Sequence, residues 1–522
     1  MTSTEIQSAQ QSELHNKLWT MVNKLRGNME AYEFKNYILG LIFYRYLSSK
    51  FEEEVASVVK GGDYKEAWNN EEKREYLIEM IKEDLGYIIR PEHLFSSLID
   101  SIKNHEFDIA SLQQAISTLE DSTRGHESEE AFSGLFDDMD LGSSKLGRDP
   151  KSRSALMADI LETIDTIEID RDNMSIDVLG DAYEFLIGMF AQTAGKKAGE
   201  FWTPVNMATL VARIAAMGRT QIKSACDPAC GAGGLLLKLR SLVGPKNLGQ
   251  IYGQEKTSTT YNLARMNMLL HDVEHKGFHI KNCDTLEDPC FGNNMEWEVQ
   301  VANPPYSVQW SANPRHLEDE RFAEYGKLAP KSKGDFAFVQ HMIHHMEDNG
   351  VAVVLLPHGV LFREGAEGHI RRHIIQRQNC LDAVIGLPAN CFMGTGIPVV
   401  CLVFKKNRRD KDNIFFMDAS SYYEPGKNQN RLRDEDIERI LKAYEKREEV
   451  EKLCRPVSID EIESVNGFNC NISRYVNTTE QDELIDIEEC NKELISYIKK
   501  IQEIDLLLSN MIQGTRITRG AN

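Results

Sequence analysis

The chain has 522 residues, 41% hydrophobic and 27% charged, a composition typical of a globular protein with roughly two to four domains. Its formal net charge of −21 disfavours unaided binding to nucleic acid, because contacts with phosphates dominate such affinity. No apolar run approaches the roughly 18–20 residues that span a bilayer, and the N-terminus has no signal pattern, so we expect a cytoplasmic protein.

The first part of the chain is predicted to be helical. Aromatic and aliphatic residues recur at helical spacing in YEFKNYILGLIFYRYLSSKFEEEV (32–55) and again in SIDVLGDAYEFLIGMFAQT (175–193). We interpret residues 1–170 as a helical domain for interactions or scaffolding, without chemistry of its own.

From about Thr203 the pattern changes to short apolar runs that alternate with helical stretches. The runs are KSACDPAC, QIYGQEK, EVQVANPPY, GVAVVLLP, LDAVIGLP and PVVCLVFKK. This alternation predicts an α/β domain built on a mostly parallel sheet. All ten cysteines lie from Cys226 onward without a CxxC pair, which favours buried reduced thiols over a zinc or redox motif.

The last segment, residues 476–522, is predicted to be a helical tail. Its apolar residues alternate spacings of three and four, as in the seam of a coiled coil, at Leu494, Tyr497, Ile501, Ile504, Leu508 and Met511. The seam is a little over two heptads long. It fits either a helix packed on its own domain or a docking helix for a partner.

A glycine-rich turn, DPACGAGG (227–234), lies between a predicted strand and the apolar LLLKL. Glycines there let the backbone approach a ligand closely at a helix N-terminus. Such a turn alone suits a dinucleotide, a nucleotide or no ligand.

Two carboxylates follow the next two predicted strands. Glu255 ends QIYGQE, 22 residues after Gly233, where an acidic residue can accept hydrogen bonds from ribose hydroxyls. Asp284 follows a further short strand in NCDTLED. Either carboxylate alone could be a helix N-cap, but together with the glycine turn they predict an adenosine-containing cofactor at the carboxyl edge of the sheet.

Asn303, Pro304, Pro305 and Tyr306 follow the apolar WEVQV, so they should lie at the same edge. The rigid prolines would aim the Pro304 carbonyl alongside that of the Asn303 side chain. Two converging acceptors would hold both N–H bonds of an amino group and relieve charge as its nitrogen attacks a carbon. Tyr306 offers a stacking face, so the pattern predicts a planar substrate with an exocyclic amino group.

These motifs, with GEFWTP (199–204) upstream, resemble those of S-adenosylmethionine-dependent N6-adenine DNA methyltransferases. LGDAYEFLIG, YNLARMNMLLH, APKSKGDFAFVQH and GAEGHIRRHII extend the resemblance to the modification subunit of type I restriction–modification systems, over nearly the whole chain. The resemblance implies a helical N-terminal domain (1–170), a Rossmann-like methyltransferase domain (171–475) and a C-terminal helical tail for partner docking (476–522).

The resemblance also implies roles for single residues. Asn303, Pro304, Pro305 and Tyr306 would hold a flipped target adenine, with Tyr306 and Phe392 packed on it, since its N6 is otherwise hidden in the duplex. Glu255 would bind the ribose of S-adenosylmethionine and Asp284 its adenine. The rest of the cofactor site would be Glu200, Phe201, Trp202, Thr203, Pro204, Val205, Asp227, Cys230, Gly231, Ala232, Gly233 and Gly234. Methyl transfer from the sulfonium would be direct, without a metal or a covalent intermediate.

The implied partners are double-stranded DNA, a restriction (nuclease/translocase) subunit, and one DNA specificity subunit shared by two modification subunits. A separate specificity subunit fits the acidic charge. Lys327, Lys331, Lys333 and the basic stretch 405–411 could contact phosphates or lie in solvated loops.

Other interpretations stay open from sequence. The enzyme could methylate a protein glutamine or an RNA base, act on DNA without a partner, or be a scaffold without activity. His341, His344 and His345 fall on one side of a predicted helix, which we interpret as an exposed helix face rather than a metal site.

Overall fold

The structure is a computed structural model that describes residue 19 and residues 31–60, 62–166, 177–194, 202–392, 396–426, 429–478 and 487–517. Glu200 and Phe201 of the expected cofactor site lie outside these residues. The chain divides into two compact units, residues 1–476 and residues 477–522. None of the helices in the described ranges is long and apolar enough to cross a membrane.

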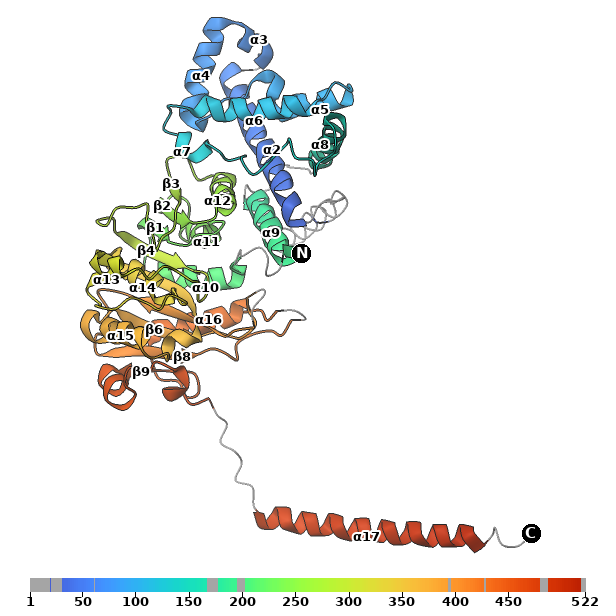
Figure 1. Ribbon diagram of the computed structural model, residues 1–522, viewed down its shortest axis with the longest axis vertical. Helices are drawn as coiled ribbons and strands as arrows, with labels where there is room; N and C mark the ends of the chain where they lie inside the picture. Colours follow the sequence, from blue (N-terminus) through green and yellow to red (C-terminus); the bar gives the residue numbers. More distant parts are fainter. Residues whose placement is uncertain are drawn as a thin grey trace. The chain divides into compact units, whose positions relative to one another are not determined.

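The N-terminal part of the first unit is helical, as the sequence predicted (Figure 1). Side-chain caps start several helices: Asp63 accepts a hydrogen bond from the Glu66 amide, and Asp149 accepts one from the Ser152 amide. The helices are α2 (Ala31–Val59), α3 (Tyr64–Asn69), α4 (Glu71–Leu85), η1 (Pro91–His93), α5 (Phe95–Lys103), α6 (Ile109–Thr123), α7 (Glu129–Phe132), α8 (Pro150–Asp165) and α9 (Asp177–Ala194).

The described strands form one sheet of mixed direction in the order β3-β2-β1-β4-β5-β7-β6-β8-β9. Strands β1 to β5 are parallel, while β7 runs antiparallel to its neighbours β5 and β6, and β9 to β8. The carboxyl ends of β1 to β6 and β8 therefore meet at one edge. The strands are β1 (Ile222–Asp227), β2 (Leu248–Glu255), β3 (Phe278–Asn282), β4 (Trp297–Ala302), β5 (Met346–Pro357), β6 (Leu381–Gly386), β7 (Val399–Phe404), β8 (Asn413–Asp418) and β9 (Cys454–Ser458).

Helices cover both faces of this sheet, which is why β6 and β7 are buried at every residue and β5 over its last eight. In β5, Val353 faces one hydrophobic core and Val354 faces the other. The elements between and after the strands are α10 (Val205–Ala216), α11 (Gly234–Val243), α12 (Ser258–Leu270), η3 (Pro314–Glu318), α13 (Glu320–Ala323), α14 (Asp335–His344), η4 (His358–Leu361), α15 (Ala366–His373), η5 (Ile374–Gln378), α16 (Asp434–Lys446), η6 (Glu461–Val465) and η7 (Ile472–Arg474).

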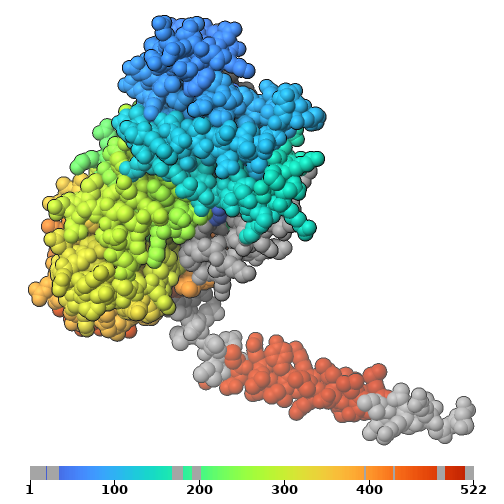
Figure 2. Space-filling view, turned by 45° about the horizontal axis from the view of Figure 1, so that its top comes forward, coloured from blue at the N-terminus to red at the C-terminus, as the bar shows by residue number. Residues whose placement is uncertain are grey.

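The N-terminal helices dock on the sheet region through α12 and the turn that follows it. Arg265 is 2% exposed and donates to the backbone carbonyls of Glu130 and Ser133. The Lys50 ammonium of α2 lies 2.6 Å from the Asp272 carboxylate. The space-filling view shows the N-terminal helices directly against the sheet region (Figure 2). Helix α12 follows Glu255, a residue of the expected cofactor site. The docked N-terminal helices therefore hold in place a helix that adjoins this site.

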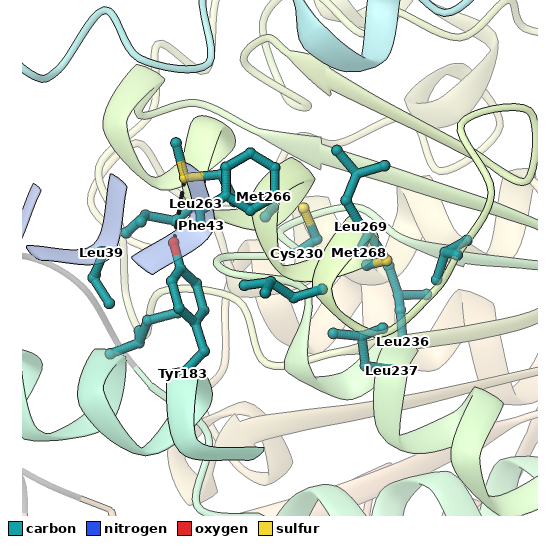
Figure 3. Close-up of a cluster of buried hydrophobic side chains, with 14 of the residues drawn as sticks. Leu39, Phe43, Tyr183, Cys230, Leu236, Leu237, Leu263, Met266, Met268 and Leu269 are labelled. Carbon is teal, nitrogen blue, oxygen red and sulfur yellow. Dashed lines mark hydrogen bonds between the residues drawn. The ribbon is translucent and has the colours of Figure 1, made fainter. Parts of the chain in front are cut away.

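A shared apolar cluster fills the junction of α2, α9, α11 and α12 (Figure 3). The Tyr183 hydroxyl of α9 donates to the Met266 sulfur of α12 at 3.3 Å, and both side chains are buried. Cys230 of the glycine-rich turn belongs to the same cluster. The glycine-rich turn therefore packs on these helices through the Cys230 side chain.

The second unit contains one described helix, α17 (Ile487–Ile517). Its predicted seam is exposed: Leu494, Tyr497, Ile501, Ile504, Leu508 and Met511 are each between 50% and 71% exposed. Ile495, Ile498, Leu506 and Leu507 are exposed as well and widen the apolar surface beyond the seam. Each of these side chains is at least 46% exposed, so the stripe faces solvent along α17.

The expected exposed histidine face is wrong. His341 of α14 and the following His345 are 1% and 0% exposed, and only His344 is partly accessible. His341 lies 3.1 Å from an Arg321 guanidinium nitrogen, and the His345 ring donates from Nδ1 to the Met295 backbone carbonyl at 2.6 Å. Burial lowers the pKa of His345 to about 4, so the ring is neutral. Among the described residues, no group of His, Cys, Asp or Glu side chains could hold a metal ion.

The basic stretch 405–411 is also not simply a solvated loop. It follows β7, which is antiparallel to β5, so it lies at the edge opposite to the carboxyl ends of β1 to β5. Lys405 and Arg408 lie 3.5 and 3.9 Å from the buried Asp382 carboxylate. Part of this charge is therefore used inside the protein.

Candidate active site at the carboxyl edge of the sheet

The glycine-rich turn connects β1 to α11, where the sequence placed it. Gly231 and Gly233 have φ angles of +53° and +84°, which residues with a Cβ rarely adopt. A Cβ on Gly233 would also lie 2.6 Å from the Met268 methyl carbon. The Cys230 side chain is buried against Gly253 of β2, where a Cβ would lie 2.9 Å from its sulfur. These contacts fix a tight turn at the N-terminus of α11.

Glu255 ends β2 with its carboxylate turned toward this turn. One carboxylate oxygen accepts from the Gly231 amide at 3.1 Å, and the other accepts from the Thr257 amide at 2.7 Å. A carboxylate oxygen can accept more than one hydrogen bond, so these two contacts are compatible with a ligand hydroxyl. The side chain is thus held in a single place before any ligand binds.

Asp284 lies just past the end of β3, which is the strand next to β2. It accepts from the Leu286 amide at 3.1 Å and lies 2.8 Å from the Lys256 ammonium. The Lys256 side chain is 74% exposed, so this ion pair is screened by solvent and can be rearranged.

Asp227 is a deeply buried carboxylate of the site, at 1% exposure. It accepts from the Ala229 amide at 2.9 Å. Burial, with a smaller contribution from the Glu255 charge, raises the pKa of Asp227 to about 8. Near neutral pH it therefore carries a proton and can donate a hydrogen bond as well as accept one.

The segment Asn303–Tyr306 begins directly after β4, the other neighbour of β1. Asn303 is 7% exposed, and its amide nitrogen donates to the Thr203 hydroxyl at 2.9 Å. The Tyr306 hydroxyl donates to the amide oxygen of the same Asn303 at 2.8 Å. The Tyr306 ring meets that of Phe392, with ring centres 6.0 Å apart and planes at 78°. The two aromatic residues expected to hold a base therefore contact each other.

The upstream segment Trp202–Val205 crosses the same edge before α10. Trp202 packs on Gly188 of α9, where a Cβ would lie 3.2 Å from the indole ring. Pro204 is the N-cap of α10 and Val205 its first residue. The segment thus joins the helical region to the site.

Two cavities open here, and the predicted residues line them. One of about 310 Å³ is lined by Gly231, Glu255, Asp284, Asn303 and Pro305. One of about 520 Å³ is lined by Thr203, Val205, Asp227, Cys230, Gly231, Gly234 and Asn303. Trp202, Ala232 and Asn303 line both, so the cavities adjoin. Tyr306 and Phe392 line neither and lie beside them.

Sequence reasoning missed one carboxylate, Asp335, which starts α14 and is 1% exposed. It accepts from the Ser307 amide at 2.7 Å and pairs with Arg363 at 2.8 Å. Ser307 has a φ of +51°, a strained value for serine, directly after Tyr306. Asp335 therefore holds the end of the Asn303–Tyr306 segment. It stands in APKSKGDFAFVQH, but nothing local in that stretch points to Ser307.

A glycine turn after β1, a carboxylate at the end of β2 and an NPPY segment after β4, all at the carboxyl ends of parallel strands, are the arrangement expected of a methyltransferase of planar amino groups. The sequence matches the N-6 DNA Methylase family over residues 174–484 and the HsdM N-terminal domain over residues 14–164.

Known proteins give the same result. The chain is 36% identical to the type I restriction enzyme MpnII methylase subunit of Mycoplasma pneumoniae, over 97% of each chain. It is 26% identical to the MjaIX methylase subunit of Methanocaldococcus jannaschii, over 96% of this chain and 90% of that one. The crystal structure of the type I methyltransferase subunit from Streptococcus thermophilus superposes with a TM-score of 0.84 at 40% identity, over 90% of this chain and 100% of that chain.

The chain therefore belongs to the N-6 DNA methylase family, among the methylase subunits of type I restriction enzymes. It is an adenine-specific DNA methyltransferase by family. The expected fold class, helical region followed by an α/β sheet, is confirmed. The comparisons do not favour a protein glutamine or an RNA base as the substrate.

Proposed function

We propose that this chain acts in a type I restriction–modification complex, where it transfers a methyl group from S-adenosylmethionine to N6 of an adenine turned out of duplex DNA. The observation that carries the proposal is the position of Asn303. Its amide lies at the carboxyl end of β4, next to the glycine turn of β1, between Thr203 on one side and Tyr306 on the other.

The side chains around the two cavities suit S-adenosylmethionine, which would supply a methyl group on a positively charged sulfur. Glu255 is fixed by two backbone amides and can accept from ribose hydroxyls, while Asp284 lies beside it for the adenine. A Cβ on Gly231 would meet no protein atom within 4 Å, so the turn faces open space. The larger cavity, with Asp227 and the start of α11, suits the charged amino-acid end.

The target amino group would be held by two acceptors, Asn303 Oδ1 and the Pro304 carbonyl. Both would bind its N–H bonds and stabilise the positive charge that develops on nitrogen as the new bond to carbon forms. Fixing the nitrogen in line with the methyl group supplies the remaining rate enhancement. The chain's residues thus act by position and electrostatics.

The described site is closed to a base. Tyr306 and Phe392 touch, and the Tyr306 hydroxyl occupies Asn303 Oδ1. A base extruded from the duplex would have to separate these rings, share or displace the hydroxyl at Asn303 Oδ1, and stack on the Tyr306 ring, which compensates part of the unstacking cost.

Sequence specificity would come from a separate subunit, with two copies of this chain per specificity subunit, and a restriction subunit would complete the complex. The net charge of −21 argues against tight DNA binding by this chain alone. The exposed apolar stripe of α17 is suited to dock on that subunit, because a surface of this kind is unfavourable in water. Its width, with Ile495, Ile498 and Leu507 beside the seam, favours a bundle of several helices over a two-stranded coil.

The test is methylation by the chain purified together with its specificity subunit. Tritiated S-adenosylmethionine is offered with adenine-unmethylated genomic DNA, with ribosomal RNA and with release factors. We expect label in DNA alone, as N6-methyladenine. Label in RNA or protein, or none in DNA, would refute the proposal.

Asn303→Ala supplies the residue-level arm of this test. It removes the acceptor, so transfer should fall below detection while S-adenosylhomocysteine still binds. Asn407→Ala, at the opposite edge of the sheet, is the matched control and should transfer normally. Turnover by Asn303→Ala near the wild-type rate would sink the mechanism.

A further inference from the structure

The Asn303 side chain is held from both ends by hydroxyl groups. Thr203 Oγ1 lies 2.9 Å from its amide nitrogen, and Tyr306 Oη lies 2.8 Å from its amide oxygen. Thr203 is 100 positions away in the sequence and half-buried beside the larger cavity. Asn303 itself is 7% exposed, so few water molecules can replace either partner.

We infer that Thr203 is a positioning residue for the base site: its hydroxyl oxygen accepts the Asn303 amide N–H and thereby keeps Oδ1 turned toward the target amino group. This inference rests on the proposed function. It gives Thr203 a role in the methyl-transfer step that is separate from any contact with the cofactor.

The resting site alone does not choose the orientation of the amide. A hydroxyl both donates and accepts, so Thr203 and Tyr306 could satisfy the Asn303 amide in either of its two orientations. With the amide turned over, its N–H bonds would face the base.

A target amino group removes this choice, because its N–H bonds only donate. Once it binds beside or in place of the Tyr306 hydroxyl, the amide oxygen must face it, since the other orientation would set donors against donors. The amide nitrogen of Asn303 then points at Thr203 and needs an acceptor. Thr203 Oγ1 is the acceptor that the structure provides there.

Removal of that hydroxyl would leave a buried N–H group without a partner in the productive orientation only. The amide would then spend more time turned over, and the loss of one hydrogen bond corresponds to a rate reduction on the order of tenfold. The contacts of the cofactor's adenosine would be unchanged, because Glu255 lines the smaller cavity and Thr203 does not.

Three variants of the full chain, each purified with the specificity subunit, test the inference. Thr203→Val keeps the shape and removes the hydroxyl, and Thr203→Ser keeps the hydroxyl. Thr209→Val, one turn into α10, is the matched control, because that hydroxyl donates to the Val205 carbonyl of its own helix. Single-turnover methyl transfer at saturating cofactor, KM for DNA, and calorimetric affinity for S-adenosylhomocysteine are measured for each.

We expect Thr203→Val to lower the single-turnover rate at saturating cofactor at least fivefold, whatever its effect on S-adenosylhomocysteine affinity, and Thr203→Ser to restore most of the rate. If Thr203→Val does not fold, Thr203→Ala gives the same comparison with Thr203→Ser.

Two results would overturn the inference. In one, both hydroxyl-free variants transfer at the rate of the Thr209→Val control. In the other, their only defect is weaker cofactor binding, with a normal rate at saturation. Failure of the proposed function is distinguishable, because the wild-type complex would then put no label into DNA, or Asn303→Ala would transfer at the wild-type rate.

Discussion

The Tyr306 hydroxyl donates a 2.8 Å hydrogen bond to Asn303 Oδ1, the atom expected to receive the target amino group. The site is thus closed by one of the residues that should stack on the base. Because an amide oxygen has two lone pairs, a donating base can share Asn303 Oδ1 with this hydroxyl or displace it. The contact gives the Asn303 oxygen a hydrogen-bond partner in the absence of a base. It should therefore discriminate against bases that cannot donate at this position.

Tyr306→Phe should therefore ease access to Asn303. The ring remains for stacking, but the competing hydrogen bond, worth about 0.5–1.5 kcal/mol, is lost. We expect the KM for DNA of the complex to fall by about two- to tenfold. Tyr306→Ala should raise it instead, because a stacking contact worth about 1–3 kcal/mol is removed. Equal defects in the two variants would show that the hydroxyl assists the base rather than competing with it.

Glu255→Ala should weaken the affinity for S-adenosylmethionine by about 1.5–3 kcal/mol, the contribution of hydrogen bonds to a charged group. The carboxylate also holds the Gly231 amide, so Glu255→Gln, which keeps one acceptor, should lose less. Calorimetric titration measures both, with the exposed Glu274→Ala as control. An unchanged dissociation constant for Glu255→Ala would remove this residue from the cofactor site.

Asp227 should make stability depend on pH. Its pKa is raised to about 8, mainly by burial, from an ordinary value of 3.8 in the unfolded chain. Between these values the folded state holds a proton that the unfolded state has released, so its contribution to stability is full below about pH 4 and falls as pH rises to about 8.

Asp227→Asn removes this titration and keeps an acceptor for the Ala229 amide. The difference in thermal unfolding midpoint, variant minus wild type, should therefore increase from about pH 5 to about pH 8 and then level off. Thermal scans across that range, without cofactor, measure it. A difference that is constant with pH would contradict the raised pKa.

Deletion of residues 477–522 should spare cofactor binding and weaken assembly, because these residues form a compact unit of their own. The substitutions Ile501→Asp and Ile504→Asp place charges in the seam and should also reduce co-purification with the specificity subunit. Gln502→Asp, between them in sequence but off the seam, is the control. Normal assembly of the truncated chain would leave the apolar stripe without the proposed partner.

Local sequence signals predicted most of the sheet edge. A glycine turn, two acidic residues and NPPY each follow an apolar run, and the structure places all of them at the carboxyl ends of β1 to β4. Their roles in binding and catalysis stay predictions. The sequence also predicted the apolar seam of α17, because helical periodicity depends only on residues a few positions apart.

What only the tertiary structure decided was which side chains meet. His341 and Asp335 look accessible from their neighbours in sequence, yet both are 1% exposed because α14 packs into the core beneath β5. Lys405 is part of a basic run, but the antiparallel β7 carries it to the far edge, beside Asp382. The sequence predicted Asn303 as an acceptor, but it did not predict the hydrogen bond from Asn303 to Thr203, 100 residues upstream. Neighbouring residues in the sequence determine local conformation. Contacts between residues about 100 positions apart are determined only by the order of the strands in the sheet and by the packing of the core.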